Sequence, residues 1–446
     1  MQNMLIPEIE HGINSRIYSS DKLAVFFIFL YWILFEHVIF FNASEVGQSM
    51  VALTVALKLL IPIGLLAYSG VQLTPIKNKY AGYYLVIFVT FLGWIGLVTL
   101  FNGDLIEWFK LLPRFIFFIA VLSIFYKTPA AFYLFAKLLI SYVIFALLQY
   151  VLTYATGAYD NPVLVTSYMS AGVTGLYANI TSMMYFPSFS VPIVRLCGFW
   201  NEPSNASGTA FAAFFLSSLV FKKEGGATWK FASYACLTAG FLCFSTVGLL
   251  AFGLALLVGF ILGNKECNNP IKSAFKLPIM VVAVGGVGAA IFGRAYVAEN
   301  YADNDILRVI VGLRDTSQTE DVYSGRLVVI ENTINHVAEH IFGTGLSAID
   351  LSNNVMMSAS APMYWLLIGG ILGLVLLLLR ELMLVAACYK LAKSSPEHVY
   401  LVQALVAIMA QHLSYGSWMN PNYFILVAAI MSFIAYENRT WIPLPQ

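Results

Sequence analysis

The segment from Arg195 to Asn205, RLCGFWNEPSN, contains charged side chains that can bind a ligand or exchange a proton. Such side chains are rare in this chain. The segment carries the guanidinium of Arg195 and the carboxylate of Glu202, whereas only 11% of the 446 residues are charged and 60% are apolar. A charged residue at the centre of a membrane span costs about 2.5–3.5 kcal/mol on insertion scales. Charged residues that such an apolar chain retains beside lipid therefore indicate a functional site.

A helix is predicted from about 203 to 221, because Pro203 suits the first helical position. Its N-terminus would add backbone N–H donors and a positive dipole end beside Arg195, which together favour an anion. Two interpretations of Glu202 stay open: a general base that accepts a hydroxyl proton, or a helix cap that pairs with Arg195.

A second candidate lies in the run RLVVIENTINHVAEHI, which predicts an amphipathic helix at about 324–341. Helical spacing places Arg326, His336 and His340 on one flank, between an apolar face and a polar one. A histidine there can exchange a proton near neutral pH, and the arginine can hold a phosphate. The alternatives are plain surface histidines or a metal site, but HVAEH lacks the HExxH arrangement and a third ligand, so no metal is predicted. The helix is expected to stop at Gly343-Thr344-Gly345.

The elements that must position these groups are apolar runs of about 20 residues, which predict an all-α polytopic membrane protein with about twelve transmembrane helices in one domain, 1–446. The stretch 229–263 is too long for one crossing and is expected to form two helices that break near Phe244 to Gly248. The twelve segments are 23–42, 49–69, 80–101, 108–126, 131–154, 205–221, 229–244, 246–263, 273–293, 362–388, 399–416 and 421–436.

Lysines fall in alternate short loops between these segments, which by the positive-inside rule are cytoplasmic. Both termini are then cytoplasmic, and two long stretches, 155–204 and 294–361, are outside; the first is expected to be irregular and laid over the bundle. These outer loops contain no lysine but five arginines. Arginine offers a planar fork that matches phosphate, although some could pair with nearby aspartates instead. The five are Arg195, Arg294, Arg308, Arg314 and Arg326.

The rest of the sequence argues against several classes of protein. A net charge of +1 argues against nucleic acid, and the five cysteines show neither metal spacing nor a disulfide framework. A cleavable signal peptide is not expected from the polar start.

Charges inside the predicted spans can pair within the bundle or form a proton relay. They include Glu36, His37, Lys58, Lys110, Arg114 and His412.

Five motifs together resemble the bacterial O-antigen or capsule polymerases of the Wzy type, in the superfamily that also holds the O-antigen ligases. Arg314 and Gly325 also match the R-x10-G spacing of such polymerases. The resemblance covers about residues 80–436, including the helix number and the two outer loops. The motifs are R-x-x-G-F-W-N-E-P-S (195–204), F-S-T-V-G (244–248), S-G-R (324–326), H-I-F-G-T-G (340–345) and Y-W-L-L-I-G-G-I-L-G (364–373).

The resemblance implies a GT-C-like bundle in the bacterial inner membrane and a metal-independent, inverting glycosyltransferase without a cofactor. Its donor and acceptor would be undecaprenyl-pyrophosphate-linked oligosaccharides, and a chain-length regulator (a polysaccharide copolymerase) would be a partner. Glu202, His336 or His340 would accept the acceptor's proton. The pyrophosphate would be held on the periplasmic side by Arg195, Arg314 and Arg326, together with Asn201 and Ser204.

One difference between this sequence and the ligase motif bears on the choice between polymerase and ligase. The ligases carry a histidine before a G-x-x-G motif, and alignment on Gly370 to Gly373 places Ala359 and Ser360 at that point. Ligation is therefore disfavoured and polymerisation favoured. The alternatives that stay open are an O-antigen ligase and a lipid-linked oligosaccharide flippase; internal repeats, which flippases usually show, are not evident.

Overall fold

A computed structural model describes most of the chain and gives the arrangement of its helices. The described residues are 18–36, 48–70, 78–102, 105–109, 111–157, 183–184, 193–196, 200, 203–263, 296, 300–301, 304, 331–346, 361–412 and 420–440.

Helices dominate the described residues, which agrees with the predicted all-α class. Eleven of the twelve predicted apolar segments contain a helix there, and the twelfth, 273–293, lies outside the described residues. The elements are α1 (Ser19–Glu36), α2 (Gln48–Ser69), α4 (Lys79–Asn102), α5 (Leu105–Phe109), α6 (Leu112–Lys127), α7 (Pro129–Thr156), β1 (Met183–Met184), β2 (Ile193–Val194), α9 (Pro203–Glu224), α10 (Ala227–Leu242), α11 (Thr246–Leu262), α15 (Ala361–Ser394), the 3-10 turn η4 (Pro396–His398), α16 (Val399–His412) and α17 (Pro421–Thr440).

Several helices are long and apolar enough to cross a membrane. Within the described residues there are four of these: Lys79–Asn102, Pro129–Thr156, Ser204–Glu224 and Pro362–Ser394. Shorter apolar helices accompany them. The chain is therefore membrane-embedded in character.

Helix boundaries follow local sequence signals. Pro129 and Pro203 begin α7 and α9, where the missing N–H costs no helical hydrogen bond. Gly157 ends α7 in the left-handed conformation, at φ 65°. The prediction of a helix that starts at Pro203 is confirmed, and so is the prediction of two helices over 229–263.

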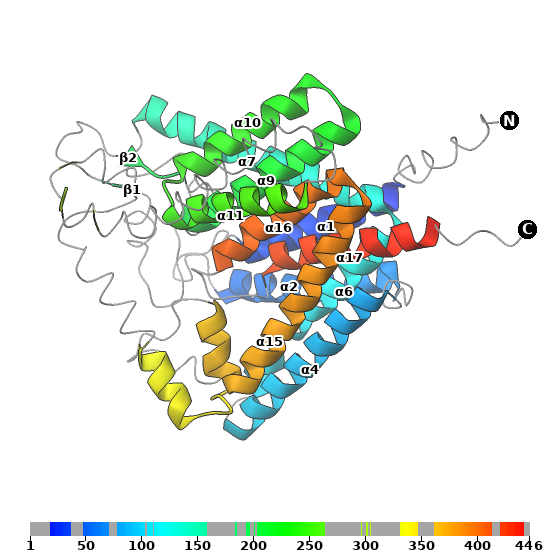
Figure 1. The fold of residues 1–446 in the computed structure, drawn as a ribbon, viewed down its shortest axis with the longest axis vertical. Helices are drawn as coiled ribbons and strands as arrows, with labels where there is room; N and C mark the ends of the chain where they lie inside the picture. Colours follow the sequence, from blue (N-terminus) through cyan, green and yellow to red (C-terminus); the bar gives the residue numbers. More distant parts are fainter. Residues whose placement is uncertain are drawn as a thin grey trace, which may run out of the picture.

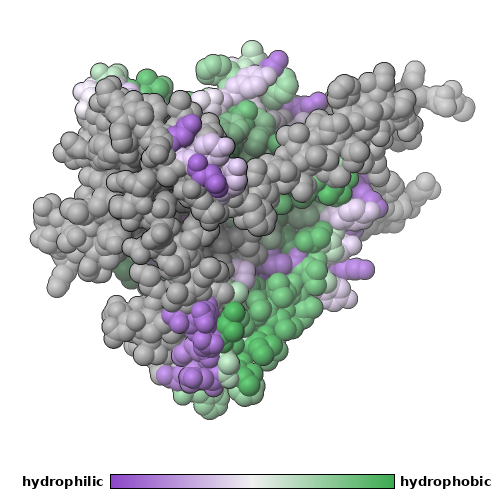
Figure 2. Space-filling view, turned by 60° about the vertical axis from the view of Figure 1, so that its left-hand side comes forward, coloured by the Kyte–Doolittle hydropathy of each residue, from purple (hydrophilic) through white to green (hydrophobic). Residues whose placement is uncertain are grey.

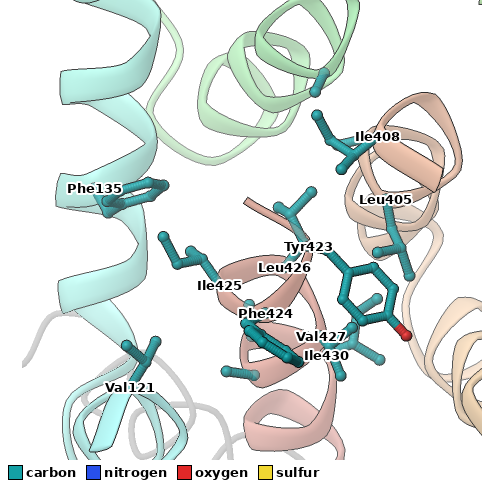
Figure 3. Packing of buried hydrophobic residues seen from close by; sticks show 14 of the residues in the cluster. Val121, Phe135, Leu405, Ile408, Tyr423, Phe424, Ile425, Leu426, Val427 and Ile430 are labelled. Atoms are coloured by element: carbon teal, nitrogen blue, oxygen red, sulfur yellow. The ribbon is translucent and has the colours of Figure 1, made fainter. Parts of the chain in front are cut away.

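Helix α17 is the centre of the fold. Every residue from Pro421 to Ala435 is buried, and α6 and α16 pack against it. Figure 3 shows its side chains pointing in several directions, with Phe424 and Ile425 on the side that Val121 and Phe135 approach and Tyr423 turned away from them. A helix that is apolar on all sides needs such a central position.

The other helices form two groups around this centre (Figure 1). Helix α9 packs against α7, α10, α11 and α16, whereas α4 packs against α15. Small residues allow the close approach within the first group, since a Cβ at Gly240 would collide with the ring of Phe211.

The first long loop contains one element that the sequence does not predict. Strands β1 and β2 pair antiparallel, with Met183 opposite Val194 and Met184 opposite Ile193. The loop is therefore not irregular throughout, and this short ladder leads directly into Arg195.

Candidate functional site

The two ends of the bundle differ in the charges that they carry. At one end Lys223 lies 3.5 Å from the ring centre of Tyr133, Lys137 pairs with Glu224 at 2.8 Å, and Lys390 lies over Tyr80. These contacts join the start of α7 to the end of α9 and the start of α4 to the end of α15. We call this the lysine-bearing end; α1 also begins there, because Asp21 accepts hydrogen bonds from Tyr68 and Thr128.

At the opposite end, each of the two sequence stretches that are predicted to lie outside contacts a helix of the bundle. The hydroxyl of Tyr154, at the end of α7, accepts a hydrogen bond from the Val194 amide at 2.8 Å. At the end of α4, the side chain of Asn102 donates to the Gly343 carbonyl at 3.5 Å. The described segments of this end, 98–102, 154–157, 193–196, 203–207, 243–248 and 343–346, contain no lysine. We call it the lysine-free end.

Arg195 is fixed at the lysine-free end by the turn between α10 and α11. Its Nε donates to the carbonyl oxygen of Cys243 at 3.1 Å, and one terminal nitrogen donates to the carbonyl of Phe244 at 3.2 Å. The next amide, Leu196, donates to Leu242 at 2.9 Å. A half-buried guanidinium held in this way also satisfies carbonyls at the end of α10 and interacts favourably with the negative end of its dipole.

The turn that receives Arg195 is shaped by its own sequence, F-S-T-V-G. Phe244 takes a left-handed φ of 43°, and Ser245 caps α11 by accepting a hydrogen bond from the Gly248 amide at 3.2 Å. A Cβ at Gly248 would collide with the side chain of Ser207. Glycine is therefore required for the first turn of α11 to touch the first turns of α9.

Two helix N-termini thus converge beside one guanidinium. The first turns of α9 and α11 touch where Gly248 meets Ser207, and each carries amide donors and a positive dipole end. Arg195, which follows β2, donates to the turn from which α11 begins. We call this group the Arg195 array. An arrangement of this kind favours a multiply charged anion such as a pyrophosphate, through fixed donors that need no rearrangement.

The histidines lie in a separate segment, residues 331–346, which we call the histidine segment. Residues 331–339 are helical, and the rings of His336 and His340 are 4.6 Å apart, which confirms that they share a flank. The pKa of His336 is lowered by burial and by the neighbouring His340. Its Nε2 is buried and has no hydrogen-bond partner within the described residues.

The apolar face of this helix does not pack inward as a unit. Val337 is buried, but Ile334 and Ile341 are exposed, whereas Thr333, on the histidine flank, is fully buried. Figure 2 shows a hydrophilic group at the foot of the molecule beside the apolar band along α4 and α15. The segment lies where a polar surface meets an apolar one.

A break in α15 holds the histidine segment. Gly370, with φ 62° and ψ −161°, interrupts the helix, and a Cβ there would collide with the carbonyl of Ile341. The Ile371 amide donates to that carbonyl at 3.0 Å, and the Thr344 and Gly345 amides donate to Leu367 and Ile368. The backbone groups that the break releases therefore find partners in the segment.

The side chain of Trp94 completes the contacts around the break. Its indole N–H donates to the Gly369 carbonyl at 2.7 Å. The Leu346 amide in turn donates to the hydroxyl of Thr99, on the same helix α4, at 3.1 Å. The motifs H-I-F-G-T-G and Y-W-L-L-I-G-G-I-L-G are thus brought together, as are R-x-x-G-F-W-N-E-P-S and F-S-T-V-G.

The structure does not bring the two pairs of motifs to each other. In Figure 1 residues 331–339 lie at the foot of α4 and α15, whereas β2 and the start of α9 lie at the upper left. The histidine segment therefore does not lie beside β2 and the Arg195 that follows it, whereas Glu202 lies outside the described residues. Helical spacing places residues on one face, but it does not determine which edge of the bundle receives that face.

Of the remaining predicted site residues, one is described by the structure and the others are not. Ser204 is half-buried in the first turn of α9, and its carbonyl accepts a hydrogen bond from the Ser207 hydroxyl at 3.0 Å. The others lie outside the described residues: Asn201, Glu202, Arg314 and Arg326. Among the residues described, no cluster of three His, Cys, Asp or Glu side chains could hold a metal ion.

One buried ionic group in the structure is not predicted from the sequence. Arg380 and Glu381 of α15 pair at 2.7 Å, and the hydroxyl of Tyr423 donates to both carboxylate oxygens at 2.7 and 2.8 Å. Arg380 is fully buried among the rings of Tyr84, Phe88, Phe91 and Tyr423. The pair stands inside the apolar run LLLLRELMLV, which is the signal that could have revealed it.

The chain matches no protein-family model, no curated protein and no solved structure.

Proposed function

We propose that this chain is an O-antigen or related surface-polysaccharide polymerase. It transfers the growing glycan from undecaprenyl pyrophosphate to the sugar end of an incoming lipid-linked repeat unit. The observation that supports this function best is Arg195, fixed by two carbonyls beside the converging N-termini of α9 and α11 at the lysine-free end. A site of that form suits a pyrophosphate leaving group.

In the proposed reaction a hydroxyl oxygen of the acceptor sugar attacks the anomeric carbon of the donor. The new glycosidic C–O bond forms as the bond from that carbon to the pyrophosphate oxygen breaks, with inversion. Undecaprenyl pyrophosphate leaves with the bonding electrons, and the hydroxyl proton passes to a general base. Arg195, with Asn201 and Ser204 of the same motif and Arg314 and Arg326 of the second loop, stabilises the charge on the leaving group.

Glu202 is the base that we propose. It directly precedes Pro203, with which α9 begins, so it belongs by sequence to the Arg195 array. The histidine segment lies at the other edge of the lysine-free end (Figure 1). The general base must lie within hydrogen-bond reach of the acceptor hydroxyl, and this requirement favours Glu202 over His336 and His340.

The proposal includes an orientation in the bacterial inner membrane. About twelve spans carry the lysine-bearing end and both termini in the cytoplasm, and the Arg195 array faces the periplasm. Exposed apolar side chains along α4 and α15 then face lipid. A chain-length regulator is the protein partner that this pathway implies.

Loss of the gene tests the function against its alternatives. A strain that lacks a polymerase displays single repeat units on its surface, whereas a strain that lacks a flippase displays none. A strain that lacks a ligase accumulates long chains on undecaprenyl pyrophosphate. We expect single repeat units on gel-separated lipopolysaccharide, restored to a ladder by the wild-type gene; either other pattern would contradict the proposal.

A further inference from the structure

Three consecutive residues fix the strand that leads into Arg195 to the bundle. The Val194 amide donates to the hydroxyl of Tyr154, in α7, at 2.8 Å. Arg195 and Leu196 donate to carbonyls at the end of α10 and in the turn that follows it. Val194 and Leu196 are both buried. A ladder of two short strands is not stable by itself, so these contacts determine where β2 lies.

Tyr154 ties this strand to the last turn of α7. Its ring lies 5.1 Å from the ring of Tyr150, one turn earlier on the same helix, and α7 packs against α10. Figure 1 shows β2 beside the end of α7. The hydroxyl is the part of Tyr154 that receives the Val194 amide. Its removal leaves that amide without this acceptor, so the position of β2 then depends on α10 and its turn alone.

The other end of the same motif is anchored by Trp200. This side chain is buried, and it lies three residues before Pro203, where α9 begins. Its ring centre lies 6.4 Å from that of Trp32 in α1 and 5.2 Å from that of Tyr142 in α7, edge to face in both cases. Trp32 and Tyr142 meet edge to face at 5.3 Å. Three rings in mutual edge-to-face contact fix one another's orientation, so Trp200 relates the start of α9 to α1 and α7.

The two anchors enclose the stretch of chain that forms the Arg195 array. Tyr154 acts one residue before Arg195, and Trp200 acts between Arg195 and the N-terminus of α9. Donors that stabilise a leaving group must already be in place when the charge develops. A displacement of about 1 Å can lower a rate on the order of 10²-fold, so residues that never touch the pyrophosphate can still control the chemistry.

We propose that Tyr154 and Trp200 are positioning residues for the pyrophosphate site. Tyr154 sets the place of Arg195, and Trp200 sets the N-terminus of α9 beside it. This inference rests on the proposed function, because it names the residues that hold the same site in position. It also gives α1 a part in the site through Trp32, although α1 precedes the stretch that resembles the polymerases.

Tyr154→Phe tests the first anchor, because it keeps the ring and removes only the hydroxyl. The readout is chain elongation by protein reconstituted in liposomes with lipid-linked repeat units. We expect kcat to fall about tenfold and KM to change by less than about twofold, since a displaced donor loses transition-state stabilisation while the binding groups remain. Tyr234→Phe is the matched control: that tyrosine is 57% exposed on α10, and its substitution should keep the wild-type rate.

Trp200→Leu tests the second anchor, because it keeps an apolar side chain and removes the ring. We expect kcat to fall at least about tenfold, and Trp200→Phe, which restores a ring, to recover most of that loss. Rates are compared at equal amounts of inserted protein. Trp229→Leu is the control, since it removes a ring beside Lys137 at the lysine-bearing end and should leave the rate unchanged.

A double-mutant cycle separates positioning from a general loss of stability. If Tyr154 acts through Arg195, its hydroxyl matters little once the guanidinium fork is gone. We therefore expect Tyr154→Phe to cost less than about twofold in an Arg195→Lys background. A residue that only stabilises the fold would cost the same factor in both backgrounds, and that result would overturn the positioning role of Tyr154.

The remaining results distinguish this inference from the proposed function. If the wild type elongates glycans and both Tyr154→Phe and Trp200→Leu do so at the same rate, the two positioning roles are overturned while the polymerase proposal stands. If Trp200→Phe is as slow as Trp200→Leu, the ring contacts with Trp32 and Tyr142 are not what Trp200 supplies, and its role is overturned. No elongation by the wild type would contradict the proposed function, and the inference would fall with it.

Discussion

The Arg195 array and the histidine segment share the lysine-free end, but they are held in different ways. Arg195 is fixed by its own side chain, which donates to carbonyls at the end of α10 beside two helix N-termini. The histidine segment is fixed by its backbone, which fills the break of α15 at Gly370. The first is an electrostatic site made from helix ends, and the second is an anchored surface segment. Substitutions should therefore affect chemistry in one region and docking in the other.

The largest expected effect is that of Arg195→Ala. Loss of a charge-stabilising donor at a leaving group lowers the rate by a factor on the order of 10³, so we expect only single repeat units in place of a glycan ladder. Immunoblots and protease accessibility must show normal expression and insertion. Arg195→Lys keeps the charge but not the fork and is expected to recover only a small part of the activity. A normal ladder with Arg195→Ala would remove this residue from the site.

Glu202→Gln compared with the double substitution of His336 and His340 by Ala tests which region supplies the base. Loss of a general base costs about 10²-fold or more, and we expect that loss for Glu202→Gln. The double histidine variant is expected to slow polymerisation by only about threefold, because the histidines lie away from Arg195 and a base acts only within hydrogen-bond reach. The measurement is the initial rate of chain elongation. The reverse order of effects would transfer the catalytic base to the histidine segment.

Gly370→Ala is expected to release the histidine segment without touching the Arg195 array. The left-handed φ and the collision with the Ile341 carbonyl should cost at least about 2 kcal/mol of docking free energy. Hydrogen exchange of the Thr344, Gly345 and Ile371 amides should become faster. Gly373→Ala is the matched control, because its Cβ would make only ordinary contacts, the nearest at 3.5 Å. Equal protection in the two variants would show that the break does not anchor the segment.

The smallest expected effect concerns the pH dependence of that docking. Burial and His340 lower the pKa of His336, so the undocked segment, with an ordinary histidine pKa of about 6.5, binds a proton at higher pH than the docked one. The contribution to docking is therefore complete above about pH 6.5 and is lost as the pH falls further.

Amide exchange at pH 7.5 and pH 5.5, corrected for intrinsic rates, checks this expectation. The wild type should lose protection of residues 341–346 at the lower pH, and His336→Gln should lose less. The same loss in both proteins would assign the effect to other groups.

The sequence predicted the parts of the fold that local patterns determine. Pro203 marked the start of α9, and the length of 229–263 predicted the break between α10 and α11 near Phe244 to Gly248. It did not reveal that this turn binds Arg195, because that contact joins residues 48 and 49 positions apart. The glycine pair at 369–370 looked like part of an apolar helix, since the break is stabilised by the distant segment 341–346. The apolar run around Arg380 and Glu381 could have marked these charges as unusual, but not their contacts, because Tyr84 and Tyr423 lie on other helices.

Reconstitution with a defined substrate tests the central claim most directly. The purified protein is placed in liposomes with undecaprenyl-pyrophosphate-linked repeat units, and the products are separated by gel electrophoresis. We predict a ladder of oligomers with release of undecaprenyl pyrophosphate, and only unreacted single units with Arg195→Ala. Single units alone from the wild-type protein, or an identical ladder from Arg195→Ala, would contradict the account.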